Sequence, residues 1–326
     1  MSALRRVQFS AGWRFVPAPG AEGDVCAFEL AGDAGSIGVE APSGRAMTIV
    51  AGDFFLATPG HRESTRWVVG GVPEGGLVPG ADYWVLAECG VVGDLVGHSP
   101  AEKEHLGRAK FLGAVRDASG RALNIGQFAA ESVGGDRGAP VFLVVGTSAE
   151  VGKTTAGVAV LRALRRKGMA EVVALKATGT SSVAELSSYL DFGAAQAFDC
   201  VDFGVPTTYP SGRADIGRVF DAALDLCLST PADAVVVECG GDILGANVPD
   251  FLQRLRRRRG AVKVVLAAAD TLAALGAQRV LREMGLEIAL ITGPCTDTPT
   301  LRRRTEDMCG VAARNLSKGC DGPWPP

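Results

Sequence analysis

The stretch Val141-Phe-Leu-Val-Val-Gly-Thr-Ser-Ala-Glu-Val-Gly-Lys-Thr-Thr155 decides the fold of the larger part of this 326-residue chain. Its first five residues are apolar and predict a buried strand, which runs directly into a loop. The loop resembles the phosphate-binding pattern G-x-x-x-x-G-K-S/T, except that five residues separate Gly146 from Gly152. Backbone N–H groups of such a loop, with the positive end of the next helix, form a cradle for anions. We therefore predict a phosphate site that begins directly after Gly146.

Two side chains of this loop carry specific chemistry. Lys153 would place a positive charge on the terminal phosphates, and the hydroxyl of Thr154 would bind Mg²⁺. The residues expected to line the cradle are Thr147, Ser148, Ala149, Glu150, Val151, Gly152, Lys153, Thr154 and Thr155.

Apolar segments and helical segments alternate from about residue 138 onward. Further buried strands are expected at 172–175, 234–237, 262–266 and 288–291, and helices at 153–167, 215–228 and 271–284. Parallel strands appear in sequence as continuous apolar runs because helices cover both faces of their sheet. The fold class predicted for residues 136–326 is therefore α/β, a doubly wound parallel sheet of the P-loop NTPase type.

The first 135 residues follow a different pattern. Short apolar runs such as 46–50, 54–57 and 83–86 are separated by glycine-rich turns, which is typical of strands joined by tight connections. One helix is expected at 99–112, after a Ser-Pro start. We predict a smaller, β-rich N-terminal domain over residues 1–135, with substrate or partner binding as its expected role.

Polar residues follow the other predicted strands of the C-terminal half. In a doubly wound sheet, ligands bind beyond the carboxyl ends of the strands. Glu238 ends an otherwise apolar strand, and a buried carboxylate needs a partner or a cation, so Mg²⁺ suits it better than a nearby arginine. Lys176 follows the second strand and would face the negative charge of a transferred phosphoryl group; a solvated lysine is the alternative.

The residues that carry this chemistry resemble those of dethiobiotin synthetase. The loop is similar to that family's G-T-x-x-E-V-G-K-T, with Thr147 and residues 150–154 matching. Three later runs are also similar: KATGTSS at 176–182, DFGAAQ at 191–196 and VECGGD at 237–242. The resemblance covers about residues 138–315 and none of the N-terminal half.

This resemblance implies ATP and Mg²⁺ as cofactors. The residues it implies for catalysis are Lys153, Lys176 and Glu238, and those for the metal are Thr154, Asp191 and Glu238. Asp202 is the alternative third metal ligand, and Gly293 and Pro294 are expected to contact the nucleotide base.

The implied function is an ATP- and Mg²⁺-dependent carbon–nitrogen ligase that phosphorylates a small carboxylate or carbamate for attack by an amine. Ser148 stands where the family has an aspartate near its diamine substrate, which makes a diamine less expected. The two-domain layout is also similar to that of P-loop N-acyltransferases of D-amino acids, which implies coenzyme A as an alternative ligand. A non-catalytic nucleotide-binding protein is the second alternative. The resemblance to dethiobiotin synthetase, whose members are typically dimers, implies a homodimer.

Bulk properties exclude some classes of partner. A formal net charge of −3 gives no general attraction to nucleic acid or to anionic membranes. The five arginines among residues 254–259 are expected on a solvated helix end. The absence of a long apolar run or a signal-peptide core, and eight scattered cysteines, lead us to expect a cytoplasmic protein with reduced thiols.

Overall fold

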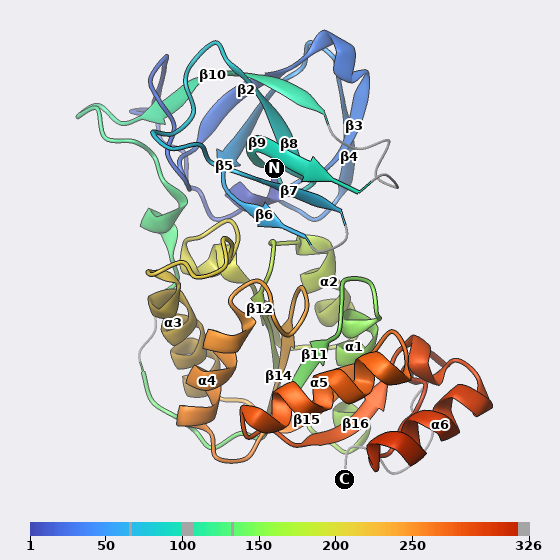
Figure 1. The fold of residues 1–326 in the computed structure, drawn as a ribbon. Helices are drawn as coiled ribbons and strands as arrows, with labels where there is room; N and C mark the ends of the chain where they lie inside the picture. The colour runs from blue at the N-terminus through green and yellow to red at the C-terminus, as the bar shows by residue number, and fades with distance from the viewer. Residues whose placement is uncertain (65–66, 100–106, 132–133, 319–326) are drawn as a thin grey trace. The chain divides into compact units, whose positions relative to one another are not determined.

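The computed structural model describes residues 1–64, 67–99, 107–131 and 134–318, and Figure 1 shows the course of the chain. The chain forms two compact units. Unit 1 comprises Met1–Ala130, Thr180–Ala184 and Asp199–Arg213, and unit 2 comprises the remainder from residue 131 onward. Two short segments of the C-terminal half therefore pack with the N-terminal unit.

The core of unit 2 is a six-stranded sheet in which every pairing is parallel. Its order is β13-β12-β14-β11-β15-β16, so the strand that precedes the phosphate loop, β11, lies inside the sheet. The strands are β11 (Val141–Gly146), β12 (Val172–Thr178), β13 (Gln196–Phe198), β14 (Ala234–Cys239), β15 (Lys263–Ala267) and β16 (Ile288–Thr292). Gly146 is the last residue of β11, as predicted.

Helices cover both faces of this sheet. The helices are α1 (Lys153–Arg166), α2 (Val183–Asp191), α3 (Ile216–Ser229), α4 (Val248–Arg258), α5 (Thr271–Glu283) and α6 (Pro299–Cys309), with short 3-10 helices η5 (Pro294–Thr296) and η6 (Leu316–Lys318). Alternate residues of β11, such as Phe142 and Val144, share one buried cluster with α1, while α3 and α4 meet through Phe220 and Phe251. The predicted α/β doubly wound sheet is confirmed.

Unit 1 is built from ten strands and four 3-10 helices in its described part. They are β1 (Arg14–Val16), β2 (Cys26–Leu30), β3 (Ser36–Glu40), β4 (Ala46–Val50), β5 (Phe54–Pro59), β6 (Arg62–Glu63), β7 (Val68–Gly71), β8 (Asp82–Ala87), β9 (Val91–His98), β10 (Arg108–Arg116), η1 (Ser2–Leu4), η2 (Gly32–Ala34), η3 (Ile125–Phe128) and η4 (Cys200–Phe203). The predicted β-rich character of this part of the chain is confirmed.

Five of these strands close into a barrel. β10 pairs with β2, β2 with β5, β5 with β9, β9 with β8, and β8 again with β10. Closure removes the unpaired edges that an open sheet would expose. Phe28 and Phe111 pack inside with ring centroids 5.3 Å apart, and Tyr83 meets Phe111 edge-on.

One predicted helix is wrong. Residues 108–112 belong to the strand β10 and alternate between buried and less buried side chains, which is the pattern of a strand rather than a helix. Pairing with β2 and β8 determines this conformation, and local helix propensity does not. The part of the predicted helix at 100–106 lies outside the described residues.

Buried charges tie the two later segments into unit 1. Arg5 contacts the carboxylates of Asp199 and Asp202 at 2.7 and 2.6 Å. Glu40 accepts hydrogen bonds from the backbone N–H groups of Val183 and Ala184 at 2.9 and 2.7 Å, so it caps the start of α2. These contacts join residues more than 140 positions apart in the sequence.

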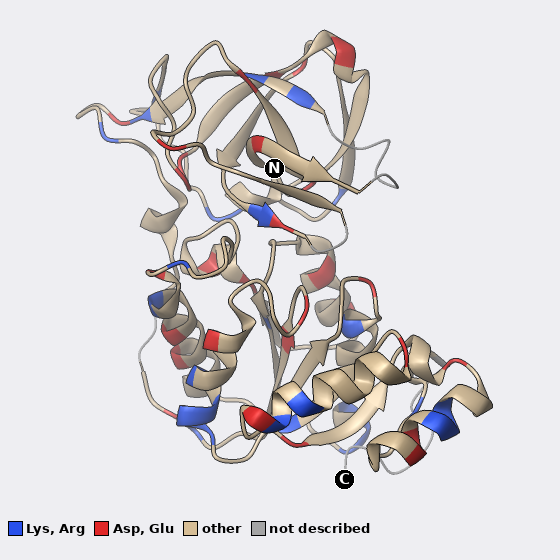
Figure 2. Cartoon of the chain, viewed as in Figure 1, with Lys and Arg blue, Asp and Glu red and all other residues tan. Residues whose placement is uncertain are grey.

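The arginine run is largely paired within unit 2. Arg254 contacts Asp221 and Asp250, and Arg258 contacts Asp221 and Asp225, so α4 sets its basic end against acidic residues of α3 (Figure 2). Ion pairs of this kind leave less charge for an external polyanion than the sequence alone indicates.

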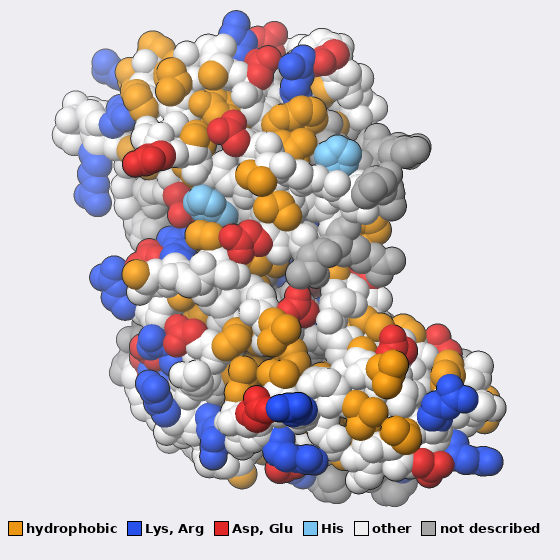
Figure 3. All heavy atoms as spheres, in the orientation of Figure 1, with side chains coloured by type: hydrophobic (Ala, Val, Ile, Leu, Met, Phe, Trp, Pro, Cys, Tyr) orange, Lys and Arg blue, Asp and Glu red, His pale blue; other side chains and the backbone are white. Residues whose placement is uncertain are grey.

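Apolar side chains also reach the surface of unit 2. They gather around the start of α4 and along α5 on the face shown in Figure 3. Leu244, before α4, and Leu272, in α5, are 68% and 78% exposed. Among the described residues, no helix combines the length and the apolar character needed to cross a membrane.

Candidate functional site

The loop between β11 and α1 folds as a compact turn at the carboxyl end of the sheet. Gly152 adopts φ 85° as the residue before α1, and Glu150 adopts φ 59°, which is uncommon for a residue with a side chain. The N–H of Thr147 donates to Ala267 O at 3.0 Å, and its hydroxyl accepts from the N–H of Ala269 at 3.1 Å. The end of β15 therefore fixes the entrance of the loop.

Lys153 folds back over this loop. Its Nζ donates to the carbonyl oxygen of Ser148 at 2.7 Å. Its aliphatic chain packs against Gly146, where an added Cβ would lie 2.7 Å from Cδ of Lys153. Burial lowers the pKa of Lys153, and the nearby carboxylates of Glu238 and Glu185 oppose that shift. The lysine is thus held inside the loop by the carbonyl of Ser148.

Glu238 and Thr154 meet at the centre of the site. The hydroxyl of Thr154 donates to Oε1 of Glu238 at 2.9 Å, and the phenol of Tyr189 donates to Oε2 at 2.8 Å. Glu238 is only 2% exposed, and its register partners on the neighbouring strands are Val144 and Lys176. The carboxylate is therefore buried, hydrogen-bonded at both oxygens and fixed in direction.

Lys176 stands on β12 beside Glu238 and forms an ion pair with Glu185 of α2. A buried amine needs an anionic partner to stay charged, and two carboxylates surround this one. Glu185 and Tyr189 are four residues apart on α2, so both project from the same side of the helix toward the site.

The electrostatics of the cluster follow from burial. Loss of water raises the pKa of Glu238, Glu185 raises it further, and Lys176, Tyr189 and Thr154 lower it. Burial beside Glu238 also raises the pKa of the Tyr189 phenol well above its usual value, so Tyr189 stays a hydrogen-bond donor. Cys239, next in sequence, has its pKa raised to about 12 by burial, which keeps the thiol protonated.

An oxygen donor pair of this kind fits Mg²⁺. Hard cations prefer carboxylate and hydroxyl oxygens, and Thr154 and Glu238 already bring one of each into contact. The structure brings together four predicted site residues: Lys153, Thr154, Lys176 and Glu238. Their roles in binding remain predictions.

The two candidates for a third metal ligand lie elsewhere. Asp191 is exposed at the end of α2 and lies two residues beyond Tyr189, about 200° around the helix from the side that meets Glu238. Asp202 belongs to unit 1, where Arg5 and Arg6 contact its carboxylate. The acidic side chain that α2 brings to the site is Glu185.

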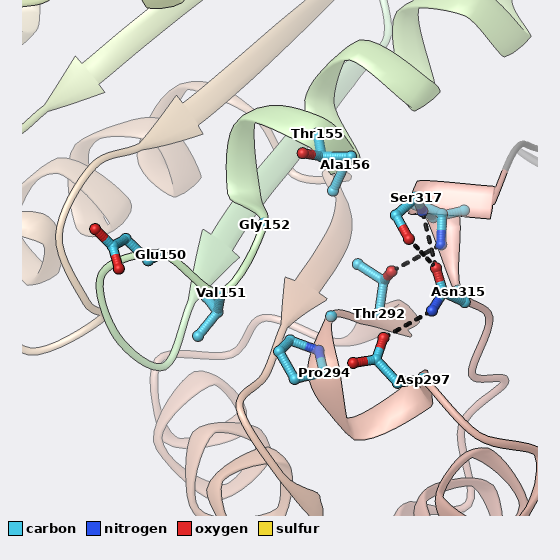
Figure 4. A pocket seen from close by; sticks show the side chains of 12 residues that line it. Glu150, Val151, Gly152, Thr155, Ala156, Thr292, Pro294, Asp297, Asn315 and Ser317 are labelled. Carbon is cyan, nitrogen blue, oxygen red and sulfur yellow. Dashed lines mark hydrogen bonds between the residues drawn. The ribbon is translucent and has the colours of Figure 1, made fainter.

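A pocket of about 190 Å³ opens beside the loop (Figure 4). One wall comes from the loop and α1, including Gly152 and Thr155, and the other from Gly293 and Pro294 after β16. Asp297 and Asn315 also line it, and the amide of Asn315 donates to Asp297 at 2.8 Å. Gly293 and Pro294, predicted to contact a nucleotide base, thus lie in one cavity with part of the phosphate loop.

Sequence reasoning missed Glu185, Tyr189, Asp297 and Asn315. Glu185 and Tyr189 belong to a short helix that contains no recognisable motif. The one signal in the sequence is their i, i+4 spacing, which places a carboxylate and a phenol on the same side of a helix. Asn315 belongs to a loop after α6 that no pattern connected with the phosphate loop.

Comparison with known proteins returns structural similarity alone. No protein-family description matches the chain, and no curated protein matches it in sequence. Among solved structures it is similar to the chloroplast FtsY of Physcomitrella patens, with 14% identity and a TM-score of 0.39 over 56% of this chain and 61% of that one. It is also similar to FtsY from Mycoplasma mycoides, with 11% identity and a TM-score of 0.39 over 57% and 65% of the two chains.

A third match is the signal recognition particle receptor FtsY of Elizabethkingia anophelis in complex with GDP, with 17% identity and a TM-score of 0.34 over 50% of this chain and 51% of that one. The chain spans less than two thirds of the length of each of these proteins. The fold of unit 2 and its loop between β11 and α1 are those of a P-loop NTPase fold, and the chain combines this fold with a β-rich unit. Likeness at this level goes no further than the fold.

The expectation of an ATP-dependent ligase is therefore corrected. The matched structures are named FtsY, one of them in complex with GDP, and none of these is named a dethiobiotin synthetase. The longest of the motifs that suggested the ligase builds the phosphate loop, and a phosphate loop is shared by proteins of many activities.

Proposed function

We propose that this chain is a nucleotide-binding protein that holds a nucleoside triphosphate with Mg²⁺ in unit 2 and acts by binding rather than ligation. The observation that carries the proposal is the 2.9 Å hydrogen bond from Thr154 to the buried Glu238. This contact joins the first helical turn after the phosphate loop to the end of β14, where the metal of a bound nucleotide would lie. When bound, Mg²⁺ would neutralise charge on the phosphate oxygens.

The chain's own groups supply the rest of the site. The N–H groups of the loop and the start of α1 favour phosphate oxygens, since both present positive partial charge. Lys153 and Lys176 add two buried amines beside them. Water is kept from the carboxylate of Glu238, because Glu238 and Tyr189 are almost completely buried.

The pocket favours guanine over adenine. A carboxylate can only accept hydrogen bonds, and Asp297 contributes one to the pocket wall. Guanine presents a ring N–H and an amino group on neighbouring atoms, whereas adenine presents an amino group beside a ring nitrogen that accepts. An acidic wall therefore pairs better with guanine, and we propose GTP as the preferred nucleotide.

Equilibrium titration with fluorescent GTP and ATP in the presence of Mg²⁺ tests both parts. We expect the fluorescent nucleotide to bind saturably. Unlabelled GTP should displace it at a lower concentration than unlabelled ATP does. Lys153→Ala should weaken binding by about tenfold or more, because a charge-assisted contact is lost. Lys167→Ala, at the exposed end of the same helix, should leave it unchanged.

Two results would overturn the proposal. Displacement by coenzyme A but by neither nucleotide would assign the cradle to a different phosphate ligand. Equal binding by the wild type and Lys153→Ala would show that the loop is not the phosphate site.

A further inference from the structure

Helix α2 contacts both charged centres of the phosphate site. Glu185 pairs with Lys176, and Tyr189, four residues later, donates to Glu238. Residues four apart lie on one side of a helix, so one rigid element holds the cation and the anion together.

The two carboxylates near Lys176 differ in their freedom to leave it. Glu238 is 2% exposed and both of its oxygens accept hydrogen bonds, so moving it would strand a buried charge. The side chain of Glu185 is 38% exposed, while that of Lys176 is 8% exposed. Glu185 can therefore turn into water, whereas Lys176 must keep an anionic partner where it is.

A terminal phosphate at the loop would compete for that partnership. Its oxygens carry more negative charge than one carboxylate, and they would lie among Lys153, Lys176 and Glu185. Keeping Glu185 in place would set two anions side by side at a buried amine. Exchange of one anion for the other removes that repulsion and leaves the charge of Lys176 compensated.

We propose that Glu185 occupies the place of the nucleotide's terminal phosphate on Lys176 in the free protein and is displaced when a triphosphate, but not a diphosphate, binds. The inference rests on the proposed nucleotide site and adds a residue that distinguishes the two ligands. Tyr189 keeps its bond to Glu238 through the exchange, so the side chain of Glu185 turns into water while α2 stays attached to the site.

The test is isothermal titration of wild type and Glu185→Gln with non-hydrolysable GTP and ATP analogues and with GDP and ADP, all with Mg²⁺. Glutamine keeps the shape of the side chain but does not compete as an anion. We expect triphosphate affinity to rise about fivefold to tenfold, which corresponds to one partly exposed ion pair, and diphosphate affinity to stay within twofold. Adding Lys176→Met to Glu185→Gln should abolish the gain.

A matched control is Glu283→Gln, which breaks an exposed ion pair with Arg279 on α5 and should change neither affinity. Glu185→Asp, which keeps the charge but shortens its reach, should give a smaller gain than glutamine. Equal changes for both ligand classes, or weaker triphosphate binding by a folded Glu185→Gln, would overturn the exchange while leaving the proposed function intact. No binding of any nucleotide by the wild type would overturn the proposed function itself.

Discussion

At the scale of single residues, the buried carboxylate of Glu238 makes nucleotide binding depend on pH. Burial raises its pKa above the ordinary value of 4.5, and Mg²⁺ needs the ionised form. As the pH falls from neutrality through the raised pKa, protons displace the metal, so the Mg²⁺-dependent part of the affinity should fall. Titrations between pH 5 and 8, with Mg²⁺ and with EDTA, measure this part directly.

The stability of the free protein should change in the opposite sense. A carboxyl group with a raised pKa stabilises the fold when protonated, and that contribution is lost as the pH rises through the raised pKa. Glu238→Gln removes the titration, so the unfolding temperature of this variant should depend less on pH while its response to Mg²⁺ disappears. A wild type whose Mg²⁺-dependent affinity is constant from pH 5 to 8 would contradict this account.

The sequence allowed prediction of those site residues whose position follows from a strand end. Lys176 and Glu238 lie near the ends of apolar strands, and Lys153 and Thr154 follow the loop after another. The carboxyl ends of parallel strands lie at one edge of a sheet. Asp191 was chosen from a motif, and the helix turns it away from the side that meets Glu238. Glu185 and Tyr189 depend on how α2 is oriented, which no local pattern determines.

At the scale of elements, Gly157 lets α1 and α2 approach. A Cβ at this position would come within 1.9 Å of the Tyr189 hydroxyl, which occupies that space to reach Glu238. Gly157→Ala should displace the phenol and cost roughly 1–3 kcal/mol for a buried hydrogen bond, more than the gain of about 1 kcal/mol in helix propensity.

Gly276→Ala on α5 is the matched control, because a Cβ there meets open space. That substitution should stabilise the protein by up to about 1 kcal/mol. Urea denaturation of both variants gives the free energies of unfolding. A stabilised Gly157→Ala protein would mean that Tyr189 does not need the space that the glycine leaves.

Elements differ in how far their own residues determine them. The strands of the parallel sheet are buried on both faces, so their apolar runs mark them wherever the chain places them. Helix α2 begins at backbone N–H groups that Glu40 caps from 143 and 144 residues away, and no neighbouring side chain signals that start. Strand β10 was predicted in part as a helix because its pairings with β2 and β8 are also not local in sequence.

At the scale of the whole molecule, unit 1 is discontinuous in sequence. Its barrel comes from the first 130 residues, and the segments 180–184 and 199–213 return to it from the C-terminal half. Composition separates residues 1–135 from the rest, but nothing local marks these two segments, because their contacts are long-range ion pairs and backbone bonds. The predicted domain boundary after residue 135 and the predicted homodimer both stay predictions.

Arg5 connects the N-terminal part of unit 1 to its later segment 199–213. The side chain of Arg5 is 11% exposed, and its guanidinium contacts Asp199 and Asp202, whose side chains are 1% and 8% exposed. Arg5→Ala would leave the buried Asp199 without its cation and Asp202 with Arg6 alone, at a cost of about 3–5 kcal/mol. Because those carboxylates lie in the segment 199–213, that segment should open first and expose Arg213, which Glu22 otherwise pairs.

Urea denaturation and limited trypsin digestion measure these two effects. We expect Arg5→Ala to unfold at lower urea and to be cut after Arg213 before other sites. Arg108→Ala, which removes an ion pair whose partners are 40% and 61% exposed, should cost less than about 1 kcal/mol and leave the digestion pattern unchanged. Equal stability of the two variants would mean that other contacts hold the segment, such as the hydrogen bonds that the backbone N–H groups of Val201 and Ser182 donate to Asp199.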